Sequence, residues 1–326
     1  MRQRRGTAAL ALVTVGLLLS SAVGFLGAWW WVFDLVANLR VQVTLLLALV
    51  ALAALITRCW WVVAGALAGV AINLAIVAPL LFAGPEPPPA VGGHLDVTFF
   101  NTKIDADVDA VIAHLASRDD DVVVLTATNR AWFDRLEASS LPLHPVMGSR
   151  LVPGLEIIVL ARDPDTEVTV HSLSNQARDA LVEVTLELDG SPVPVLGTHP
   201  VSPMTPLRAQ RRDLVLEWIG LWPERRDAPV VVVGDLNATP WSAPFRAMLD
   251  RSGLMDSLRL HGPQPSWPVS LGPVGIPIDH VLHSPELTTV ERELGPSFGS
   301  DHRMVHARIS RVEPAQLAHT RLARRP

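Results

Sequence analysis

Three long apolar runs open the chain, and the pattern changes completely after them. Residues 7–27, 41–57 and 61–83 each lack a charged side chain. A helix that crosses a bilayer needs about 20 apolar residues, with about 17 as a lower limit, so each run is long enough to span. Tryptophans, whose indole rings favour the headgroup region, lie near the ends of the runs. They are Trp29, Trp30, Trp31, Trp60 and Trp61. The pattern predicts an anchor of three transmembrane helices over residues 1–83.

Arginines beside these runs predict the orientation of the anchor. Arg2, Arg4 and Arg5 precede the first run, and Arg58 lies between the second and the third. Cytoplasmic flanks carry an excess of arginine and lysine, so we expect a multi-pass cell-membrane protein with a cytoplasmic N-terminus. Three crossings then place the rest of the chain outside the cytoplasm. A cleaved signal peptide is the alternative for the first run, but two further runs follow and no clear cleavage site stands out.

A proline-rich stretch follows the third run. Residues 84–93 read GPEPPPAVGG, a composition that favours an extended, semi-rigid spacer, so we expect a linker there. At the other end, residues 311–326 contain Arg321, Arg324 and Arg325 without clear periodicity. We expect this basic tail to fray and to lie near anionic lipid.

Between residues 94 and 310 the chain alternates between strand and helix patterns. Short β-rich runs predict the strands LDVTFFN, DVVVL, LEIIVLAR, EVTVHSL, ALVEVTLEL, VPVLGTH, APVVVVGDLN, IPIDHVLHS and MVHARIS. Helical spacing is found in DADVDAVIAHLASR, LRAQRRDLVLEWIGLW and APFRAMLDRSG, the last with Gly253 as a stop. Many strands with few helices are typical of an α+β layered domain.

Composition narrows the function classes. Apolar residues make up 49% of the chain and charged residues 18%, and most of the apolar excess lies in the first 83 residues. The one cysteine, Cys59, excludes an intrachain disulfide and a cysteine metal cluster. A formal charge of −5 argues against a dedicated nucleic-acid binder, which normally has a basic face.

Polar side chains recur where the predicted strands end. Taken singly, each is more often a turn or capping residue, and GDLN alone could be a β-turn. The ordered set is more specific: an Asn, a His, Asp-x-Asn, an Asp, and then Asp-His, each beside a β-run. Its members are Asn101, His199, Asp235, Asn237, Asp279, Asp301 and His302.

This ordered set resembles the endonuclease/exonuclease/phosphatase superfamily, across residues 95–309. GDLNATP and GSDHRMV carry the most specific part of the resemblance. It implies a DNase I-like sandwich of two β-sheets flanked by helices, with the site at one edge. WSAPFRAML and SWP are similar to a narrower branch, the membrane-anchored teicoplanin-resistance proteins of high-GC Gram-positive bacteria.

The resemblance also implies roles for the catalytic residues. Asp235 would polarise or deprotonate the attacking water, and Asn237 would orient it. His302 would contact the phosphate or transfer a proton, while Asp279 would fix its tautomer. His199 would face the phosphate and act as an acid.

The same resemblance implies a metal site. Asp301 would bind a divalent cation, and Asn101 would help to position the metal or the phosphate. Hard oxygen ligands of this kind suit Mg²⁺ or Mn²⁺ better than zinc.

One position departs from the family pattern. The strand in DVVVLTATNR normally ends in Gln-Glu, and that Glu is the principal metal ligand, but Thr126 and Ala127 stand there instead. Thr126 or Thr128 could offer a neutral oxygen, or Glu156 could reach in from a neighbouring strand. None restores a carboxylate at the same place, and fewer anionic ligands weaken a hard-cation site.

Three hypotheses follow. The first is a membrane-anchored phosphoester hydrolase that acts on a phospholipid or a polyprenyl pyrophosphate, with the lipid bilayer as its surroundings and no obligate protein partner. The second is a pseudoenzyme that binds a phosphorylated lipid or cell-wall precursor, motivated by Ala127. The third is an external nuclease, against which the low positive charge and the tether both count. The loop 262–277, with Trp267, either shapes the pocket mouth or is a surface connection.

Overall fold

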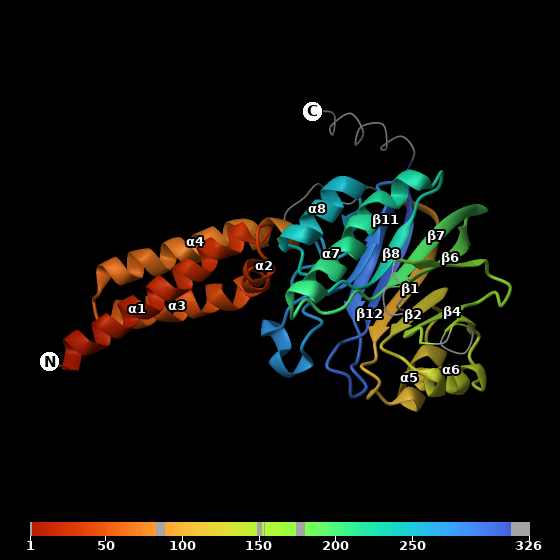
Figure 1. The fold of residues 1–326 in the computed structure, drawn as a ribbon, viewed down its shortest axis with the longest axis horizontal. Helices are drawn as coiled ribbons and strands as arrows, with labels where there is room; N and C mark the ends of the chain where they lie inside the picture. Colours follow the sequence, from red (N-terminus) through yellow and green to blue (C-terminus); the bar gives the residue numbers. More distant parts are fainter. Residues whose placement is uncertain (1, 83–88, 149–151, 153, 174–179, 314–326) are drawn as a thin grey trace.

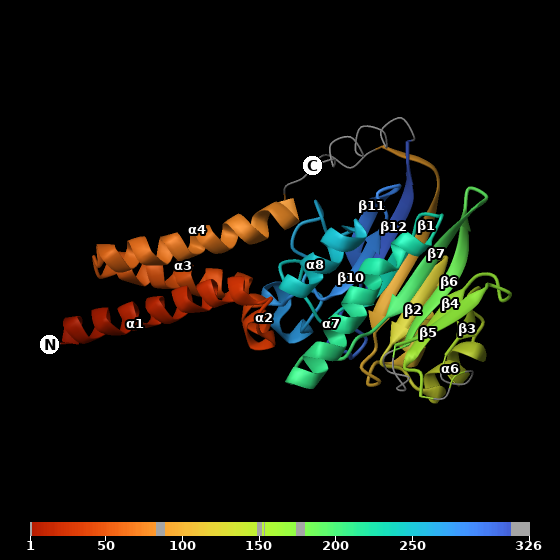
Figure 2. The ribbon, with the colours of Figure 1, turned by 45° about the horizontal axis from the view of Figure 1, so that its top comes forward.

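A helical bundle extends from one side of a mixed α/β domain in the computed structural model (Figure 1). The structure describes residues 2–82, 89–148, 152, 154–173 and 180–313. The N-terminus lies at the far end of the bundle, away from the domain (Figures 1 and 2).

The bundle is built from α1 (Arg2–Val23), η1 (Gly24–Leu26), α2 (Trp31–Ala37), α3 (Arg40–Ile56) and α4 (Trp60–Phe82). Two helical stretches, Gly6–Leu26 and Trp60–Phe82, are long and apolar enough to cross a membrane. The predicted third span is not confirmed as a separate long helix, because α3 has 17 residues, which is at the lower limit for a span. The pair α2 and α3 is bent by 57° at a break and counts as a third span only if it is taken as one unit.

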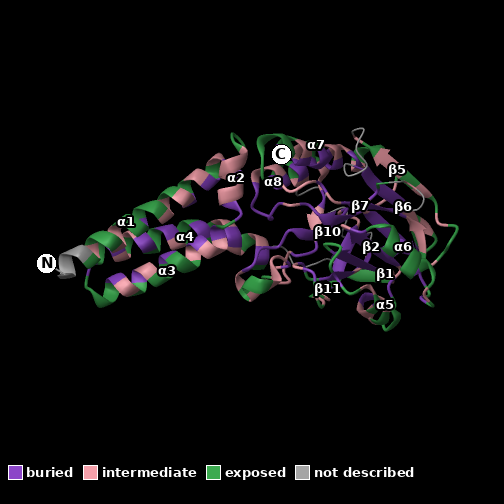
Figure 3. Cartoon of the chain, turned by 60° about the horizontal axis from the view of Figure 1, so that its bottom comes forward, coloured by how far each residue is buried: buried purple, intermediate pink, exposed green. Residues whose placement is uncertain are grey.

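A buried polar network ties the three long helices together at the end near the domain. The Nη1 of Arg40 donates to Oδ1 of Asn73 at 2.9 Å, and Nδ2 of Asn73 donates to Oγ of Ser21 at 2.8 Å. Such interhelical hydrogen bonds satisfy polar groups that would otherwise be costly in an apolar bundle. The outward faces of α1 and α3 carry exposed apolar side chains, among them Leu12 and Leu49 (Figure 3).

Two six-stranded sheets form the α/β domain. The first has the order β11-β12-β1-β2-β4-β3, and the second β5-β6-β7-β8-β10-β9. The strands of the first sheet are β1 (Ala90–Asn101), β2 (Val122–Thr126), β3 (His144–Met147), β4 (Ile157–Ala161), β11 (Leu287–Leu294) and β12 (Val305–Val312). Those of the second are β5 (Val168–Ser172), β6 (Ala180–Leu188), β7 (Ser191–Thr198), β8 (Val231–Asp235), β9 (Met255–Asp256) and β10 (Asp279–His283). The pairs β1–β2 and β7–β8 are parallel, and the other strand pairs in these sheets are antiparallel.

Helices cover the outer face of each sheet. The first sheet is covered by α5 (Val108–Ala116) and α6 (Arg130–Glu137), and the second by α7 (Pro206–Leu221) and α8 (Ala243–Ser252). Short 3-10 helices, η3 (Pro223–Arg225) and η4 (Val269–Val274), lie in the connections. The predicted α+β, DNase I-like two-sheet architecture with flanking helices is confirmed.

The core has three layers because the central strands are buried on both faces. In β2, Val122 and Val124 pack between the sheets, while Val123 and Leu125 pack under α5 and α6. Successive side chains of a strand point to opposite faces, so unbroken apolar runs such as VVVL fill two cores at once.

The structure shifts two predicted boundaries. β1 begins at Ala90, which pairs with Val312, so the last residues of the predicted linker 84–93 are strand and the predicted domain start at residue 94 is late. The amide of Gly93 donates to Asp189, which fastens this segment to the β6–β7 turn. β12 runs to Val312, inside the predicted tail 311–326. Residues 84–88 and 314–326 lie outside the described residues.

Candidate active site

Strand alternation brings three polar side chains into the space between the sheets at one end. In β1, Val97 and Phe99 pack in the central core, and Asn101 follows two residues later on the same face. The last inward residue of β8 is Asp235, and the first of β10 is Asp279, directly opposite it in the antiparallel register. All three side chains are buried, at the end of the sandwich where polar residues replace the apolar core residues.

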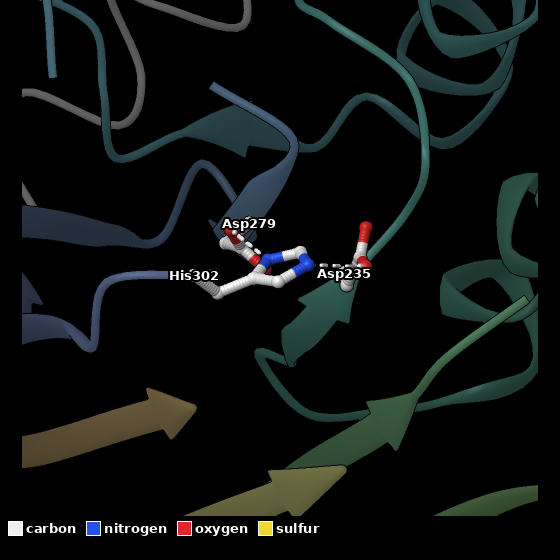
Figure 4. Close-up of side chains that lie close together, drawn as sticks. All are labelled: Asp235, Asp279 and His302. Carbon is white, nitrogen blue, oxygen red and sulfur yellow. Dashed lines mark hydrogen bonds and ion pairs between the residues drawn. The ribbon is translucent and has the colours of Figure 1, made fainter. Parts of the chain in front are cut away.

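His302 lies between the carboxylates of Asp235 and Asp279 (Figure 4). Its Nδ1 is 2.9 Å from Oδ2 of Asp279 and 3.0 Å from Oδ1. Its Nε2 is 3.8 Å from Oδ2 of Asp235. The backbone amide of His302 donates to Oγ of Ser300, which holds the loop before β12 in place. The carboxylate on Nδ1 fixes the ring so that Nε2 points toward Asp235.

The electrostatics of this group favour a charged imidazole. Burial lowers the pKa of His302, but the contact with Asp279 outweighs it, with help from Asp235 and Asp301, and raises the pKa to about 9. Burial raises the pKa of Asp235, and the nearby Asp279 carboxylate adds to that rise. A positively charged donor therefore lies beside a carboxylate whose pKa is shifted toward the range useful for a general base.

The remaining predicted catalytic residues, Asn237 and His199, both contact Asp235. Its Oδ1 accepts from the amide of Asn237 at 2.9 Å. Its Oδ2 is 3.5 Å from Nε2 of His199, which follows β7. The side chain of Asn237 donates to the carbonyl of Pro200 at 3.1 Å, so it ties the loop after β8 to the loop after β7. Asn237 has φ 50°, a left-handed conformation that Asn tolerates better than most residues.

Asn101 and Asp301, predicted as metal ligands, occupy the side of the site near β1. Nδ2 of Asn101 donates to Oδ2 of Asp235 at 3.0 Å and lies 3.2 Å from Nε2 of His302. Asp301 lies further out, with Oδ1 4.0 Å from Nε2 of His302. The structure thus brings all the predicted site residues into one connected group.

Two further side chains hold Asp301. Nε1 of Trp267 donates to its Oδ2 at 3.1 Å, and Nζ of Lys103 lies 3.2 Å from the same oxygen. Burial acts to raise the pKa of Asp301, but the hydrogen bonds from Trp267 and Lys103 lower it overall. The loop 262–277 therefore reaches the site through Trp267. Lys103 was missed by sequence reasoning, although the only lysine of the chain stands two residues after Asn101.

The end of β2, where the family pattern has its glutamate, carries neutral groups. Ala127 has φ 54°, and its carbonyl and that of Thr126 accept from the hydroxyl of Thr102. Thr126 is buried and pairs with Asn101 in the parallel register. Its Oγ1 has no hydrogen-bond partner among the described residues. The hydroxyl of Thr128 donates to the backbone carbonyl of Glu156.

The donor set fits a divalent cation. Ligand atoms of Asp235, Asp279 and His302 lie within 4.8 Å of one another, a spacing that can hold a metal ion. Asp279 already contacts Nδ1 of His302, and the oxygens of Asn101 and Asp301 are further hard donors beside the same ring. Thr126 pairs with Asn101 in the sheet, and its Oγ1 has no partner among the described residues. This set has fewer negative charges than the family pattern.

Comparison with known proteins places this site in a family. The model of the endonuclease/exonuclease/phosphatase family matches residues 99–302, which include every predicted site residue. The chain belongs to the endonuclease/exonuclease/phosphatase family. A comparison with curated proteins gives no match. The narrower teicoplanin-resistance branch stays a prediction.

Solved structures share the fold at low sequence identity. An endonuclease/exonuclease/phosphatase from Bacteroides vulgatus has a TM-score of 0.55 and 15% identity, covering 68% of this chain and 100% of that one. A protein of the same description from Beutenbergia cavernae has a TM-score of 0.53 and 20% identity, covering 67% and 72%. D. rerio TDP2, solved with a single-strand DNA product, has a TM-score of 0.51 and 17% identity, covering 67% and 99%.

Proposed function

We propose that this protein is a membrane-anchored, metal-dependent phosphoester hydrolase that acts outside the cytoplasm on a phosphorylated lipid. The observation that carries the proposal is the position of His302, whose ring is fixed by Asp279 and directed at Asp235. An imidazolium beside a carboxylate supplies both a charge for the phosphoryl oxygens and a base for water, which phosphoester cleavage needs.

Each side chain has a role that follows from its contacts. Asp235 takes a proton from the attacking water, while the Asn237 amide fixes its Oδ1 so that Oδ2 faces the site. His302 stabilises the negative charge that develops on the phosphoryl oxygens. His199, 3.5 Å from Asp235, donates a proton to the leaving group. A Mg²⁺ or Mn²⁺ ion held by Asn101 and Asp301 would neutralise further phosphate charge.

The helical bundle supports a bilayer setting. Gly6–Leu26 and Trp60–Phe82 can each cross a membrane, and their outward faces are apolar. The arginines at residues 2, 4 and 5 and at residue 58 favour a cytoplasmic N-terminus, and an odd number of crossings then puts the domain outside. This orientation requires α3, whose 17 residues are at the lower limit for a span, to form the third crossing, because α2 contacts the domain.

Apolar side chains near the site support a lipid substrate. Met204 and Leu207 are exposed between His199 and the first turn of α7, and Leu271 is exposed in η4, shortly after Trp267. Nε2 of Gln42, in the first turns of α3, donates to the carbonyl of Val274, which places the end of η4 against the bundle. Exposed apolar side chains favour contact with a membrane or an apolar ligand where they gather on one surface. A phospholipid or a polyprenyl pyrophosphate fits such a rim.

The alternative is a pseudoenzyme that binds a phosphorylated lipid or wall precursor without cleaving it. Ala127 favours this alternative, because it removes an anionic metal ligand. The contacts among Asp235, Asp279 and His302 favour the enzyme, since a chain that only binds has no need of a directed base. A nuclease activity has no comparable support, since the likeness to TDP2 concerns the fold alone.

The test is hydrolysis by the full chain in lipid nanodiscs, with Mg²⁺, with Mn²⁺ and with chelator. It is followed as phosphate release from the pyrophosphate and as separation of the cleaved products from the two phosphodiesters. A polyprenyl pyrophosphate, a phospholipid and a single-stranded oligonucleotide are compared as substrates. Asp235→Asn removes the base, and Asp163→Asn, in an exposed turn, is the matched control. We expect metal-dependent turnover of a lipid substrate by the native chain and by the control only. Native inactivity, with turnover gained by Ala127→Glu, would support the pseudoenzyme.

A further inference from the structure

The short helix α2 is docked into the α/β domain by a buried ion pair. Nη2 of Arg212, in α7, donates to Oδ2 of Asp34 at 2.9 Å, and both side chains are only 1% exposed. The other oxygen of Asp34 accepts from Oγ of Ser242 at 2.8 Å and from the amide of Ala243 at 3.1 Å. The hydrogen-bond donors around this buried carboxylate indicate that α2 is held in one position against the domain.

The same arginine reaches the catalytic loop. Nη1 of Arg212 donates to the carbonyl of Asn237 at 3.0 Å, and the amide of Asn237 donates to Oδ1 of Asp235. A continuous chain of hydrogen bonds therefore runs from Asp34 in α2, through Arg212, to the carboxylate at the centre of the site.

A second contact from the same segment holds the loop further along. Oδ1 of Asn38, which ends α2, accepts from the amide of Thr239 at 3.1 Å and from its hydroxyl at 2.7 Å. Packing is close as well: a Cβ on Gly27 would lie 3.2 Å from Cα of Asp34 and 3.4 Å from Cβ of Ala243. Side chains of the N-terminal region therefore contact the segment 237–243 at Thr239, Ser242 and Ala243.

Apolar contacts continue the interface. Val77 and Leu81 of α4 pack with Trp241 and Leu258 of the domain in one buried cluster. The bundle and the catalytic loop thus share both a polar and an apolar contact. Both α2 and α4 contact the stretch that directly follows Asp235.

We propose that α2 positions the catalytic loop, with Asp34 and Arg212 as positioning residues, so that the N-terminal region completes the active site. The catalytic role of this loop rests on the proposed function, but its positioning does not. Without Asp34, the buried Arg212 keeps its ion pair with Asp213 but loses the contact that joins it to α2. The loop that Arg212 holds is then less firmly positioned. The helices would then do more than hold the domain at the membrane.

The experiment uses the full chain in nanodiscs and measures hydrogen exchange at single amides. Asp34→Asn keeps a side-chain oxygen for Ser242 but removes the charge that Arg212 requires. The docking readout is the amide of Ala243, which donates to Asp34. The positioning readout is the amide of Asn237, which donates to Asp235. We expect both amides to exchange at least tenfold faster in the variant, and turnover to fall at least tenfold with a smaller change in KM.

Arg226→Gln is the matched control. Arg226 follows α7 at its other end and pairs with Glu183, away from this loop. It should leave the exchange of Asn237 and the turnover unchanged. Exchanging the charges, with Asp34→Arg and Arg212→Asp in one chain, should recover part of the protection if the pair itself is responsible.

The outcomes separate the two proposals. Faster exchange at Ala243 with unchanged exchange at Asn237 and unchanged turnover would overturn the positioning role and leave α2 as a docked tether. Unchanged exchange at both amides would overturn the docking itself. If the native chain has no turnover on any substrate, the proposed function fails, while exchange at Asn237 still decides whether α2 positions the loop.

Discussion

The two sides of the site differ in the charged groups they contain and in the contacts that hold those groups. On the side of β8 and β10, Asp235, Asp279 and His302 are all buried, and each has a partner within the group. On the side of β1 and β2, Ala127 stands where the family pattern has a carboxylate, and the hydroxyl of Thr126 has no partner within the described part of the chain. Asp235 and Asp279 come from one sheet and Asn101 and Thr126 from the other, while His302 joins them from the loop before β12. The proposed acid-base residues and the proposed metal ligands can therefore be varied separately.

The largest effect is expected from removal of the base. Asp235→Asn keeps the shape of the side chain but cannot accept the proton of water, and loss of a general base costs about 10²–10⁴-fold in rate. We expect turnover to fall by about that factor, measured as phosphate release under saturating metal. Asp256→Asn would be a poor control, because Asp256 is buried against His280. Asp163→Asn is preferable, and equal losses in both variants would contradict the role of Asp235.

A second large effect is expected from Asp279→Asn, which leaves the His302 ring without its carboxylate. Asp279 raises the pKa of His302, so its removal lowers that pKa from about 9. If the imidazolium is the active form, turnover of the native chain falls as the pH rises through about 9, and in the variant it falls at lower pH. Turnover against pH checks this, and an unshifted alkaline limb would show that His302 is not the group that titrates.

The ion pair of His302 and Asp279 should also contribute to the free energy of unfolding, and its contribution should be larger at low pH than at high pH. The folded pKa of His302 is raised above its ordinary value of 6.5. Its contribution to the free energy of unfolding is therefore fully present below about pH 6.5 and is lost as the pH rises through about 9. Denaturant unfolding of the native chain and of Asp279→Asn across this window should converge toward high pH. A gap between them that widens toward high pH would contradict the assignment.

An intermediate effect is expected from restoring the missing carboxylate. Ala127→Glu adds an anionic oxygen at the end of β2, so we expect Mn²⁺ affinity to rise by about tenfold or more, because affinity follows the charge count of the ligands. Ala127→Gln has the same length and the same backbone strain without the charge. Mn²⁺ titration that shows equal affinities for the two variants would place the metal elsewhere.

The smallest effect is expected from Trp267→Phe. It removes the hydrogen bond to Asp301 but keeps an aromatic ring beside His302. Since that bond helps to lower the pKa of Asp301, the pKa should rise, and the metal concentration for half-maximal turnover should increase by a few fold. A change in the maximal rate alone would assign Trp267 to substrate contact instead.

Much of this arrangement could be predicted from residue pattern, because the relevant physics is local. Unbroken runs of β-branched residues predict β2 and β8, and polar residues at the ends of such strands predict the site. The resemblance carried by the ordered motifs implied a site at one edge of the sandwich. The strands β3, β9 and β11 were not predicted, since HPVM contains a proline, β9 is only two residues long, and LTTVEREL is rich in charge.

The coupling between helices and site could not be predicted, because it depends on pairs far apart in the chain. Asp34 lies in a short segment between apolar runs, where it is balanced in charge by Arg40. In the structure its partner is Arg212, while Arg40 is buried against Asn73. A single sequence gives no signal for such a choice of partner, since both arginines are equally suited by charge.

We expect Asp235 to act as the base in hydrolysis although Ala127 leaves the metal site with fewer anionic ligands. The most direct test is turnover of a polyprenyl pyrophosphate by the full chain as Mn²⁺ is raised, with Asp235→Asn beside the native protein. The account predicts native turnover that saturates at higher Mn²⁺ than in Ala127→Glu and that Asp235→Asn abolishes. Native turnover equal to that of Asp235→Asn at every Mn²⁺ concentration would contradict it.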